Sequence, residues 1–557
     1  MSTGISYQAK PWLKHYVNGV PEDIEFEDVF LPDFLERWAL KRPDVHALIF
    51  QGYKMSFKEL KDKVDRLATS LSGFGIKKGD SVAILLPNVI PCVISYYAIL
   101  RIGAIVVMNN PLYSDRELEH QFNDSGAKVL ITLDLFCKRM TELKQKTGIR
   151  QIIYTSIGDY LPFPKNYLFK LVAKKKGLAA DVKPAADVYD WKDILFKTSP
   201  SPPAVKLAFD DVAMYQYTGG TTGVSKGAML THRNISYNTQ QFIALFPSLK
   251  GGKEVCLAAP PYFHAFGLTA AMNASIQMGW TQIVIPKPQP DELLAAIKKF
   301  KPTVVYLVPT MFIGILDRPD FDKVDMKFVK LCGSGGGALP VEVLKKIEKK
   351  TGCSFTEGYG MTEASPITHM NPFGGLTKPG SVGVPIPNTL ARIVDLEDGE
   401  TDVPVGEIGE IVFQGPQVMK GYLNMPDETA NALKGGWLHS GDIGKMDEDG
   451  YFYVVDRKKD MVISGGYNVY PLEIERVYDD HPKTAEAAAI GVPHPTRGEQ
   501  VKLIIVLKEG ESATEEEIIK YCSDKLAKYK WPTIVEFRSE LPRSAIGKLL
   551  KHILREE

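Results

Sequence analysis

A run of small, hydroxyl and basic residues between Tyr217 and Gly227 has the composition of a phosphate-binding loop. It contains four glycines, four serine or threonine residues and Lys226. Glycines allow the backbone to turn its N–H groups toward an anion, and the hydroxyl groups and the lysine add donors and positive charge. It is not a Walker A loop, because no lysine directly follows the last glycine of a G-x-x-x-x-G frame. A flexible surface loop is the alternative, but this combination at the end of an apolar run favours an anion site.

The same run, Y-T-G-G-T-T-G-V-S-K-G, resembles the phosphate loop of the acyl-adenylate-forming enzymes. These are the acyl-CoA synthetases, the adenylation domains of peptide synthetases and the beetle luciferases. Two upstream blocks, Asn110–Tyr113 and Leu118–Gly126, and several downstream motifs follow the family's order, so the likeness covers nearly the whole chain. It is closest to the bacterial and archaeal long-chain fatty-acid–CoA ligases. The resemblance implies that ATP activates a carboxylate to acyl-AMP with release of pyrophosphate, and that the acyl group then passes to CoA.

A carboxylate and ATP are both anions, so they repel each other when the enzyme brings them together. Unit charges about 4 Å apart interact by roughly 4 kcal/mol at an effective dielectric of 20, so the enzyme must supply cations and donors. By the resemblance, Lys548 in the block Leu541–Lys548 bridges the carboxylate and the α-phosphate. Thr362 reaches the α-phosphate, and Glu363 binds Mg²⁺ together with Thr222. Few protein carboxylates suffice for Mg²⁺ when phosphates and water complete its shell.

The resemblance also assigns residues to the nucleotide. Tyr359, in the block Glu357–Glu363, would stack near adenine, Asp442 would accept hydrogen bonds from the ribose hydroxyls, and Arg457 would contact ribose or phosphate. Ser440 stands where the family's motif has threonine. The expected nucleotide-binding residues are Thr218, Gly219, Gly220, Thr221, Thr222, Gly223, Gly335, Gly336, Gly337, Glu357, Gly358, Tyr359, Gly360, Met361, Asp442 and Arg457, with Lys226 on the β- and γ-phosphates.

A second group of residues is expected to line the acyl pocket. The block Pro261–Gly267 is aromatic around His264, and a histidine in such a setting is often a core residue, whereas the resemblance places it on the pocket wall. The run Gly333–Pro340 would let a flat base or an acyl chain approach the backbone; a plain glycine-rich turn is the alternative. The expected pocket residues are Phe263, His264, Phe266, Val308 and Ser334.

More than one domain must bring these motifs together, since 557 residues exceed the usual size of a single core. Strand-like and helix-like segments alternate from 81 to 154 and again from 254 to 350, which predicts an α/β body of two stacked subdomains with parallel sheets. Residues 380 to 456 are β-rich, and a small α+β unit follows a charged segment. We therefore expect an N-terminal domain over 1–456, a hinge over 457–460 and a small C-terminal domain over 461–557.

The resemblance implies that the small domain is mobile and serves twice. In one pose it delivers Lys548 to the adenylation site. In the other it turns about Lys459 and presents Gly465, Gly466 and Tyr467 toward the channel for CoA. A charged hinge suits this motion, because a buried apolar linker would not rotate freely.

The bulk composition is that of an ordinary globular protein, with 44% apolar and 24% charged residues. Basic and acidic residues balance at 67 each, which argues against a nucleic-acid partner. The six cysteines lack a C-x-x-C pair and favour a reduced, cytoplasmic protein. No signal peptide is expected. The uncharged window Ser81–Leu100 is broken by Pro87, Asn88 and Pro91, which predicts a strand, a turn and a helix instead of a membrane span.

Residues 157–200 have the composition of an insertion. Within 161–176, apolar residues such as Phe163 and Leu168 mix with lysines. Such a segment can lie on the surface of an anionic membrane, or it can be a solvated linker packed on the body. Both interpretations stay open, as does a homodimer, which occurs in the family.

Together these patterns predict a fatty acid–CoA ligase that uses ATP, Mg²⁺ and CoA. An aryl- or cyclic-acid–CoA ligase and a fatty acyl-AMP ligase that loads a carrier protein remain as alternatives, because the depth of an acyl tunnel depends on side-chain packing. A non-enzymatic lipid-binding protein would be expected to have lost the phosphate loop or the C-terminal lysine, and both are present.

Overall fold

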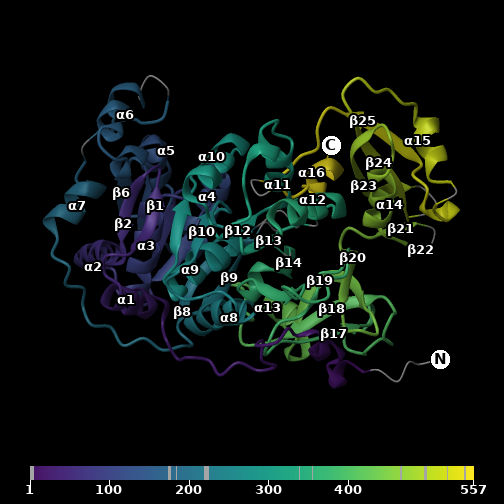
Figure 1. Ribbon diagram of the computed structural model, residues 1–557, viewed down its shortest axis with the longest axis horizontal. Coiled ribbons are helices and arrows are strands. Elements are labelled where there is room, and N and C mark those ends of the chain that lie inside the picture. The colour runs from purple at the N-terminus through teal and green to yellow at the C-terminus, as the bar shows by residue number, and fades with distance from the viewer. Residues whose placement is uncertain are drawn as a thin grey trace.

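Four β-sheets carry the chain (Figure 1). The computed structural model describes residues 6–173, 177–183, 185–218, 225–337, 339–353, 355–464, 467–494, 498–523, 525–544 and 547–556. In Figure 1 the α/β body occupies the left and centre, a green four-stranded sheet lies at the lower right, and the small C-terminal unit lies at the upper right. The expected α/β class is confirmed.

The first α/β layer is a seven-stranded sheet in the order β7-β6-β5-β3-β4-β8-β9. Its strands are β3 Ser81–Leu85, β4 Ile105–Met108, β5 Val129–Leu133, β6 Gln151–Thr155, β7 Val188–Asp190, β8 Val212–Thr218 and β9 Lys226–Thr231. The helices that alternate with them are α2 Phe57–Gly73, α3 Ile90–Arg101, α4 Asp115–Ser125 and α5 Asp134–Lys144. All pairs are parallel except β8 with β9. The apolar, fully buried β3 and β5 are typical of a sheet covered on both faces.

The second layer is a nine-stranded sheet in the order β16-β15-β14-β13-β12-β10-β11-β1-β2. Its strands are β1 His46–Phe50, β2 Tyr53–Ser56, β10 Val255–Ala258, β11 Thr281–Val284, β12 Val304–Leu307, β13 Leu331–Gly335, β14 Phe355–Gly360, β15 Ile367–Met370 and β16 Val384–Pro385. The helices that accompany it are α1 Leu31–Lys41, α8 His232–Ala244, the π-helix η4 Gly267–Asn273, α9 Ala274–Met278, α10 Pro290–Phe300, α11 Pro309–Leu316 and α12 Val341–Thr351. The pairs from β1 to β14 through β11, β10, β12 and β13 are parallel.

The glycine run after Cys332 begins inside a strand, since Gly333 and Gly335 belong to β13 and Gly336 and Gly337 follow it. The sequence predicts a strand over Val329–Leu331, but β13 begins at Leu331 and continues through Gly335. A side chain at Gly333 would meet the ring of Tyr306 at 3.0 Å, so the absence of a side chain there lets β13 lie against this aromatic neighbour.

Two smaller sheets complete the chain. The four-stranded sheet contains β17 Leu390–Val394, β18 Gly409–Gln414, β19 Leu438–Met446 and β20 Phe452–Arg457, and α13 Pro426–Ala432 precedes β19. The last sheet contains β21 Val462–Ser464, β22 Tyr467–Val469, β23 Thr484–His494, β24 Gly498–Leu507 and β25 Ile534–Arg538, with α14 Pro471–Asp479, α15 Glu515–Tyr521 and α16 Lys551–Glu556. A turn over 458–460 joins the two sheets.

The segment 157–200 is partly built into the body. It forms η3 Ile157–Tyr160, α6 Lys165–Ala173, β7 and α7 Trp191–Lys197, and β7 extends the seven-stranded sheet beside β6. The other short helices are η1 Tyr7–Ala9, η2 Pro11–His15, η5 Phe321–Lys323, η6 Thr362–Ala364, η7 Lys434–Gly436 and η8 Lys528–Lys530. Within the described ranges, no helix has both the length and the apolar character that crossing a membrane requires.

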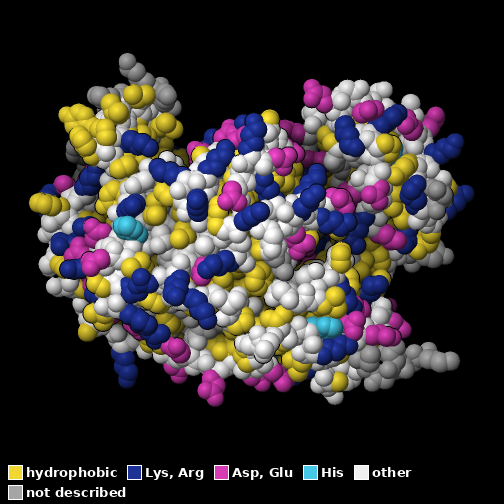
Figure 2. Space-filling view, viewed as in Figure 1, with side chains coloured by type: hydrophobic (Ala, Val, Ile, Leu, Met, Phe, Trp, Pro, Cys, Tyr) yellow, Lys and Arg dark blue, Asp and Glu magenta, His cyan; other side chains and the backbone are white. Residues whose placement is uncertain are grey.

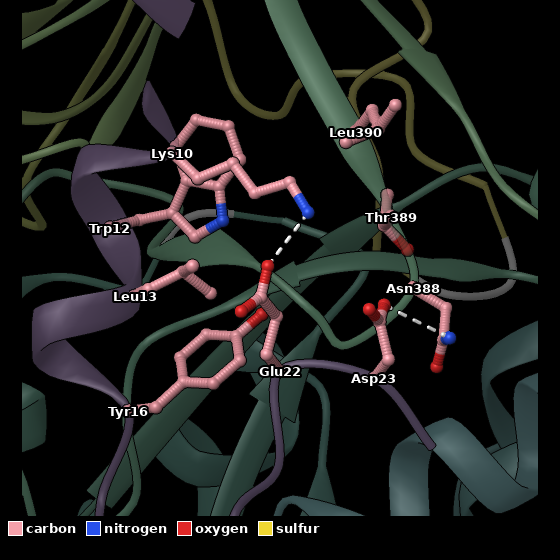
Figure 3. Close-up of a pocket in the computed structure, with 9 residues that line it drawn as sticks. All are labelled: Lys10, Trp12, Leu13, Tyr16, Glu22, Asp23, Asn388, Thr389 and Leu390. Carbon is pink, nitrogen blue, oxygen red and sulfur yellow. Dashed lines mark hydrogen bonds and ion pairs between the residues drawn. The ribbon is translucent and has the colours of Figure 1, made fainter. Parts of the chain in front are cut away.

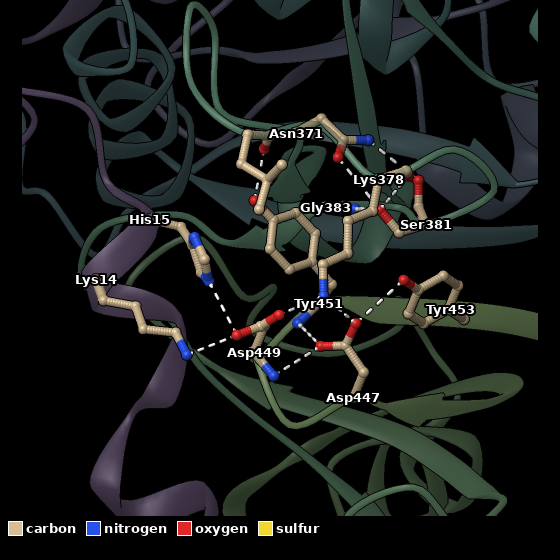
Figure 4. Close-up of polar contacts among 11 residues, drawn as sticks. Lys14, His15, Asn371, Lys378, Ser381, Gly383, Asp447, Asp449, Tyr451 and Tyr453 are labelled. Carbon is tan, nitrogen blue, oxygen red and sulfur yellow. Dashed lines mark hydrogen bonds and ion pairs between the residues drawn. The ribbon is translucent and has the colours of Figure 1, made fainter.

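Charged groups fasten the N-terminal segment to the turn between β19 and β20 (Figure 4). Lys378 forms ion pairs with Asp447 at 2.6 Å and with Asp449 at 2.7 Å, and Lys14 pairs with Asp449 at 2.6 Å. The same segment borders a cavity of about 250 Å³ (Figure 3). The lining residues are Lys10, Trp12, Leu13, Tyr16, Glu22, Asp23, Asn388, Thr389 and Leu390. None of the expected site residues is among them.

Candidate active site

The expected phosphate loop connects two paired strands. Thr218 at the end of β8 and Lys226 at the start of β9 are cross-strand partners at the mouth of this hairpin. The loop residues Gly219, Gly220, Thr221, Thr222 and Gly223 lie outside the described residues. The Tyr217 hydroxyl donates to Asp124 at 2.7 Å, which fixes the hairpin on α4. The structure therefore places both ends of the loop.

Lys226 meets two residues that sequence reasoning did not identify. Its ammonium forms an ion pair with Glu428 of α13, and it lies 5.2 Å from the ring centroid of Tyr422. The backbone around Tyr422 runs beside β9, because the N–H of Leu423 donates to the carbonyl of Gly227 at 2.8 Å. These contacts join residues about two hundred positions apart in sequence, and no local sequence pattern predicts them.

The Thr362–Glu363 pair lies beside the same hairpin. The two residues open the short helix η6, which packs against β8 and β9. The preceding turn is tight, because a side chain at Gly360 would meet the carbonyl oxygen of Pro366 at 1.9 Å, and the N–H of Met361 donates to that oxygen at 2.9 Å. The glycine thus sets the path of the backbone into the pair.

Glu363 offers one carboxylate oxygen to a cation. The Tyr422 hydroxyl donates to Oε1 at 2.7 Å, and the residue is only 7% exposed. Among the described residues, Oε2 has no hydrogen-bond donor and no basic group within ion-pair distance. A carboxylate oxygen is the kind of ligand that Mg²⁺ prefers, so Glu363 fits a magnesium ligand.

A second cluster joins three expected nucleotide residues. On β19, Asp442 is buried, and its Oδ2 accepts a hydrogen bond from the Tyr359 hydroxyl at 2.5 Å. Its Oδ1 lies 2.6 Å from Nε of Arg457, its cross-strand partner on β20, but accepts no well-aligned hydrogen bond. The Ser440 hydroxyl accepts from the Asp442 N–H at 3.0 Å, so serine holds the turn in threonine's place. Asp442 thus retains acceptor capacity for a ligand hydroxyl.

Lys548 reaches this cluster from the C-terminal unit. Burial, then the positive charge of Arg457, lowers the pKa of its ammonium, while Asp442, Asp460 and Glu363 act in the opposite direction. Lys548 therefore lies close enough to Arg457, Asp442 and Glu363 for their charges to act on its ammonium. Lys548 as a whole is an exposed residue.

Lys459, the expected hinge residue, lies in the turn between β20 and β21 and is exposed. Partial burial lowers the pKa of this ammonium to about 8, with Asp460 opposing the shift and Arg457 and Lys548 reinforcing it. Arg555 pairs with Asp460 at 2.8 Å. The turn thus concentrates positive charge where the two sheets meet.

Two of the expected acyl-pocket residues, Phe263 and Phe266, have defined neighbours in the structure. Phe263 is fixed to β8, since its carbonyl accepts from Gln216 at 2.8 Å. The ring of Phe266 would touch a side chain at Gly335 at 3.5 Å and meets the ring of Tyr306 edge-on at 6.2 Å. Tyr306 was not predicted.

Two hydroxyl groups and one imidazole are the polar side-chain groups among the expected pocket residues and Tyr306. The hydroxyls of Tyr306 and Ser334 are buried without a hydrogen-bond partner among the described residues. Burial, followed by the charge of Lys548, lowers the pKa of His264 to about 4. Val308 instead packs in the core with Met311 and Phe312.

The remaining glycine and acidic positions form one wall. Gly335 on β13 pairs with Gly358 on β14, and Gly336 and Gly337 form the bend that follows. Glu357 accepts from the N–H of Leu339 at 3.1 Å, and burial raises the pKa of its carboxyl to about 7. A backbone surface without side chains suits a flat ligand.

The residues expected to serve CoA are only partly placed. Gly465 and Gly466 lie outside the described residues. Tyr467 opens β22, which pairs with β21 directly after the hinge. The roles of these residues stay predictions.

The expected nucleotide residues Tyr359, Asp442 and Arg457 contact one another, and the chain has a large α/β body followed by a small C-terminal unit, as in a nucleotide-dependent enzyme. The family model described as AMP-binding enzyme matches residues 35–423, and the model of its C-terminal domain matches 473–548. The chain belongs to the AMP-binding enzyme family.

Three known proteins illustrate the likeness. The long-chain-fatty-acid–CoA ligase of Bacillus subtilis is 45% identical over 98% of both chains. The long-chain-fatty-acid–CoA ligase of Escherichia coli O6:H1 is 40% identical, again over 98% of both. The crystal structure of ATP-bound MatB from Rhodopseudomonas palustris is 31% identical and superimposes with a TM-score of 0.81, covering 94% of this chain and 98% of that one.

Proposed function

We propose that this protein is an AMP-forming fatty acid–CoA ligase with a preference for long chains. The observation that carries the proposal is that Arg457 pairs with Asp442 at 2.6 Å and that both of them, together with Glu363, act electrostatically on Lys548, although Glu363 and Lys548 are far apart in sequence. Relatives with this activity that align along almost the entire chain support the choice of acid and acceptor.

In the first half-reaction the carboxylate attacks the α-phosphorus of ATP, and pyrophosphate leaves. Lys548 and Arg457 reduce the repulsion between the two anions, and Asp442 orients the nucleotide through its ribose. With a pKa of about 4, His264 stays neutral near pH 7, so it adds no competing charge and is a weak base. A Mg²⁺ ion held by Glu363 would neutralise phosphate charge when bound.

In the second half-reaction the CoA thiolate attacks the acyl carbonyl, and AMP leaves. We propose that residues 1–456 and 461–557 act as two domains that turn about a hinge at 457–460, with Gly465, Gly466 and Tyr467 facing CoA after the turn. The exposed, positively charged turn around Lys459 between two separate sheets supports this division.

The test is a pyrophosphate-release assay over straight-chain acids of graded length, with benzoate and a cyclic acid, followed by thioester assays with CoA and with a phosphopantetheinyl carrier protein. We expect the highest kcat/KM for long chains and transfer to CoA. Highest activity with benzoate, or transfer to the carrier alone, would contradict the proposal. Sedimentation of the same samples tests the predicted homodimer.

We also propose that α6 touches an anionic membrane. Figure 2 shows hydrophobic side chains gathered at the end of the molecule where Figure 1 places α6. Phe163 is 86% exposed, Tyr167 70% and Leu168 56%, with the exposed Lys165 among them. Apolar side chains interleaved with lysine suit the interface of a membrane that carries acidic lipids.

Co-sedimentation with vesicles tests this contact. The protein should bind vesicles that contain phosphatidylglycerol and bind pure phosphatidylcholine weakly, and Phe163→Ser with Leu168→Ser should reduce binding at least fivefold. Phe196→Ser on α7 is the matched control, because Phe196 is 88% exposed outside this patch. Equal binding by the double variant and the wild type would refute the contact.

A further inference from the structure

Tyr422 lies between the two groups that are expected to hold the phosphate end of ATP. Its hydroxyl donates to Oε1 of Glu363 at 2.7 Å, and its ring faces the ammonium of Lys226 with 5.2 Å between nitrogen and centroid. The residue is 9% exposed. One side chain therefore contacts both the expected magnesium carboxylate, on the helix η6, and the expected phosphate cation, on the strand β9.

The backbone holds Tyr422 in this place. Its N–H donates to the Thr429 hydroxyl at 2.8 Å, and it forms an isolated bridge with Ala228 of β9. A side chain at Gly421 would meet Thr429 at 2.6 Å, so the two segments are in close contact. The phenol thus has little freedom to change the distance between its two neighbours.

The hydrogen bond also orients the Glu363 carboxylate. The backbone carbonyl of Glu363 accepts from the N–H of Met419 at 2.8 Å, which anchors the main chain close to Tyr422. With Oε1 bound to the phenol, the carboxylate cannot rotate freely, and Oε2 stays available. A buried carboxylate without this donor could turn toward Lys226 or Arg457 and would then present a poorer ligand.

We infer that Tyr422 is a positioning residue that fixes the spacing and orientation of Glu363 and Lys226 for magnesium and the ATP phosphates. This inference rests on the proposed function. The hydroxyl serves the carboxylate and the ring serves the lysine, since an ammonium is attracted to an aromatic face. The two contributions can be separated by substitution.

Tyr422→Phe removes the hydroxyl and keeps the ring. In the presence of a non-hydrolysable ATP analogue, the Mn²⁺ concentration that half-saturates the site, measured by electron paramagnetic resonance, should rise roughly tenfold, as loss of a hydrogen bond to a carboxylate suggests. Affinity for the analogue at saturating metal should change less than twofold. Unchanged Mn²⁺ affinity would overturn the inference.

Two further measurements separate positioning from a structural effect. Tyr237→Phe is the matched control, because Tyr237 also donates its hydroxyl to a carboxylate, Asp28, outside the cleft; its Mn²⁺ affinity should equal that of the wild type. Transfer from supplied acyl-AMP to CoA involves no ATP phosphates, so Tyr422→Phe should retain it. Loss of both half-reactions together would indicate a structural role and refute the inference.

The failure of the inference and the failure of the proposed function give different results. If the wild type binds the analogue with Mn²⁺ and Tyr422→Phe has the same Mn²⁺ affinity, only the proposed role of Tyr422 is refuted. If the wild type itself binds no metal–nucleotide complex, both the role of Tyr422 and the proposed function are refuted.

Discussion

Gly547 of the C-terminal unit is in direct contact with Thr310 at the start of α11 in the body. A side chain at Gly547 would meet Cγ2 of Thr310 at 2.7 Å and Oγ1 at 2.8 Å. The next residue is Lys548, whose charge acts on His264, Arg457 and Asp442. The contact therefore holds Lys548 near Arg457 and Asp442, as the pose expected for adenylation would require.

Gly547→Ala should weaken this pose. Overpacking against Thr310 is expected to slow acyl-AMP formation roughly tenfold, while transfer from supplied acyl-AMP to CoA changes less than twofold. Gly510→Ala is the matched control, since Gly510 shares a positive φ, +81° against +77°, but has open space around its Cα. Equal effects of the two variants would attribute the change to backbone strain alone.

Lys548→Ala should separate the two half-reactions more strongly. We expect the rate of adenylation, measured by pyrophosphate exchange, to fall at least about a hundredfold. The variant lacks the positive charge that would offset the repulsion between the carboxylate and the α-phosphate. Thioester formation from supplied acyl-AMP should remain appreciable. Lys445→Ala, which removes an exposed lysine of β19, serves as control. Equal loss of both halves would remove Lys548 from its assigned role.

Glu428→Gln should tighten ATP binding. The Glu428 carboxylate forms an ion pair with the Lys226 ammonium, so an ATP phosphate that binds Lys226 must displace this carboxylate. A half-exposed ion pair of this kind contributes up to about 1 kcal/mol. Its removal should therefore lower the KM for ATP roughly fivefold. Glu342→Gln, which breaks an exposed pair with Lys345, should leave KM unchanged. A higher KM in Glu428→Gln would show that the carboxylate orients the lysine instead of competing for it.

Glu357→Gln should alter the dependence of stability on pH. Burial raises the pKa of this carboxyl from 4.5 to about 7, so the folded protein binds the proton more tightly than the unfolded chain. The resulting stabilisation is complete below pH 4.5 and is lost as pH rises through 7. Between about pH 5 and pH 7.5 the wild type should lose roughly 2 kcal/mol more unfolding free energy than the variant.

Urea unfolding at several pH values measures this difference. Glutamine keeps an acceptor for the Leu339 N–H, so the hydrogen bond at 3.1 Å can persist in the variant. Parallel pH curves for wild type and Glu357→Gln would show that this carboxyl does not titrate in the range.

Local patterns predicted much of the scaffold. The capping box of Ser56 and Glu59 starts α2, and the window Ser81–Leu100 folds into β3, a turn and the buried helix α3. The long strand β23, in contrast, was not predicted; its run Ala487-Ala488-Ala489 has no strong strand composition, and its eleven residues are held by pairing with β24. Long-range pairing decided that element.

The candidate site also contains residues that were predicted from the sequence and residues that were not. The phosphate loop was predicted from its composition, whereas the Thr362–Glu363 pair and Lys548 were predicted from the resemblance of their blocks to the family's motifs. Tyr422 was missed, since its partner Glu363 is 59 residues away and nothing near Tyr422 in sequence suggests a contact.

The sequence by itself determined the chemical groups, their order and the class of sheet that carries them, because these follow from residue type and short-range periodicity. Only the tertiary structure decided that the Tyr422 hydroxyl meets Glu363, that Glu428 meets Lys226, and that Gly547 contacts Thr310. Such contacts depend on how separate sheets pack, and packing is fixed by all the side chains at an interface together.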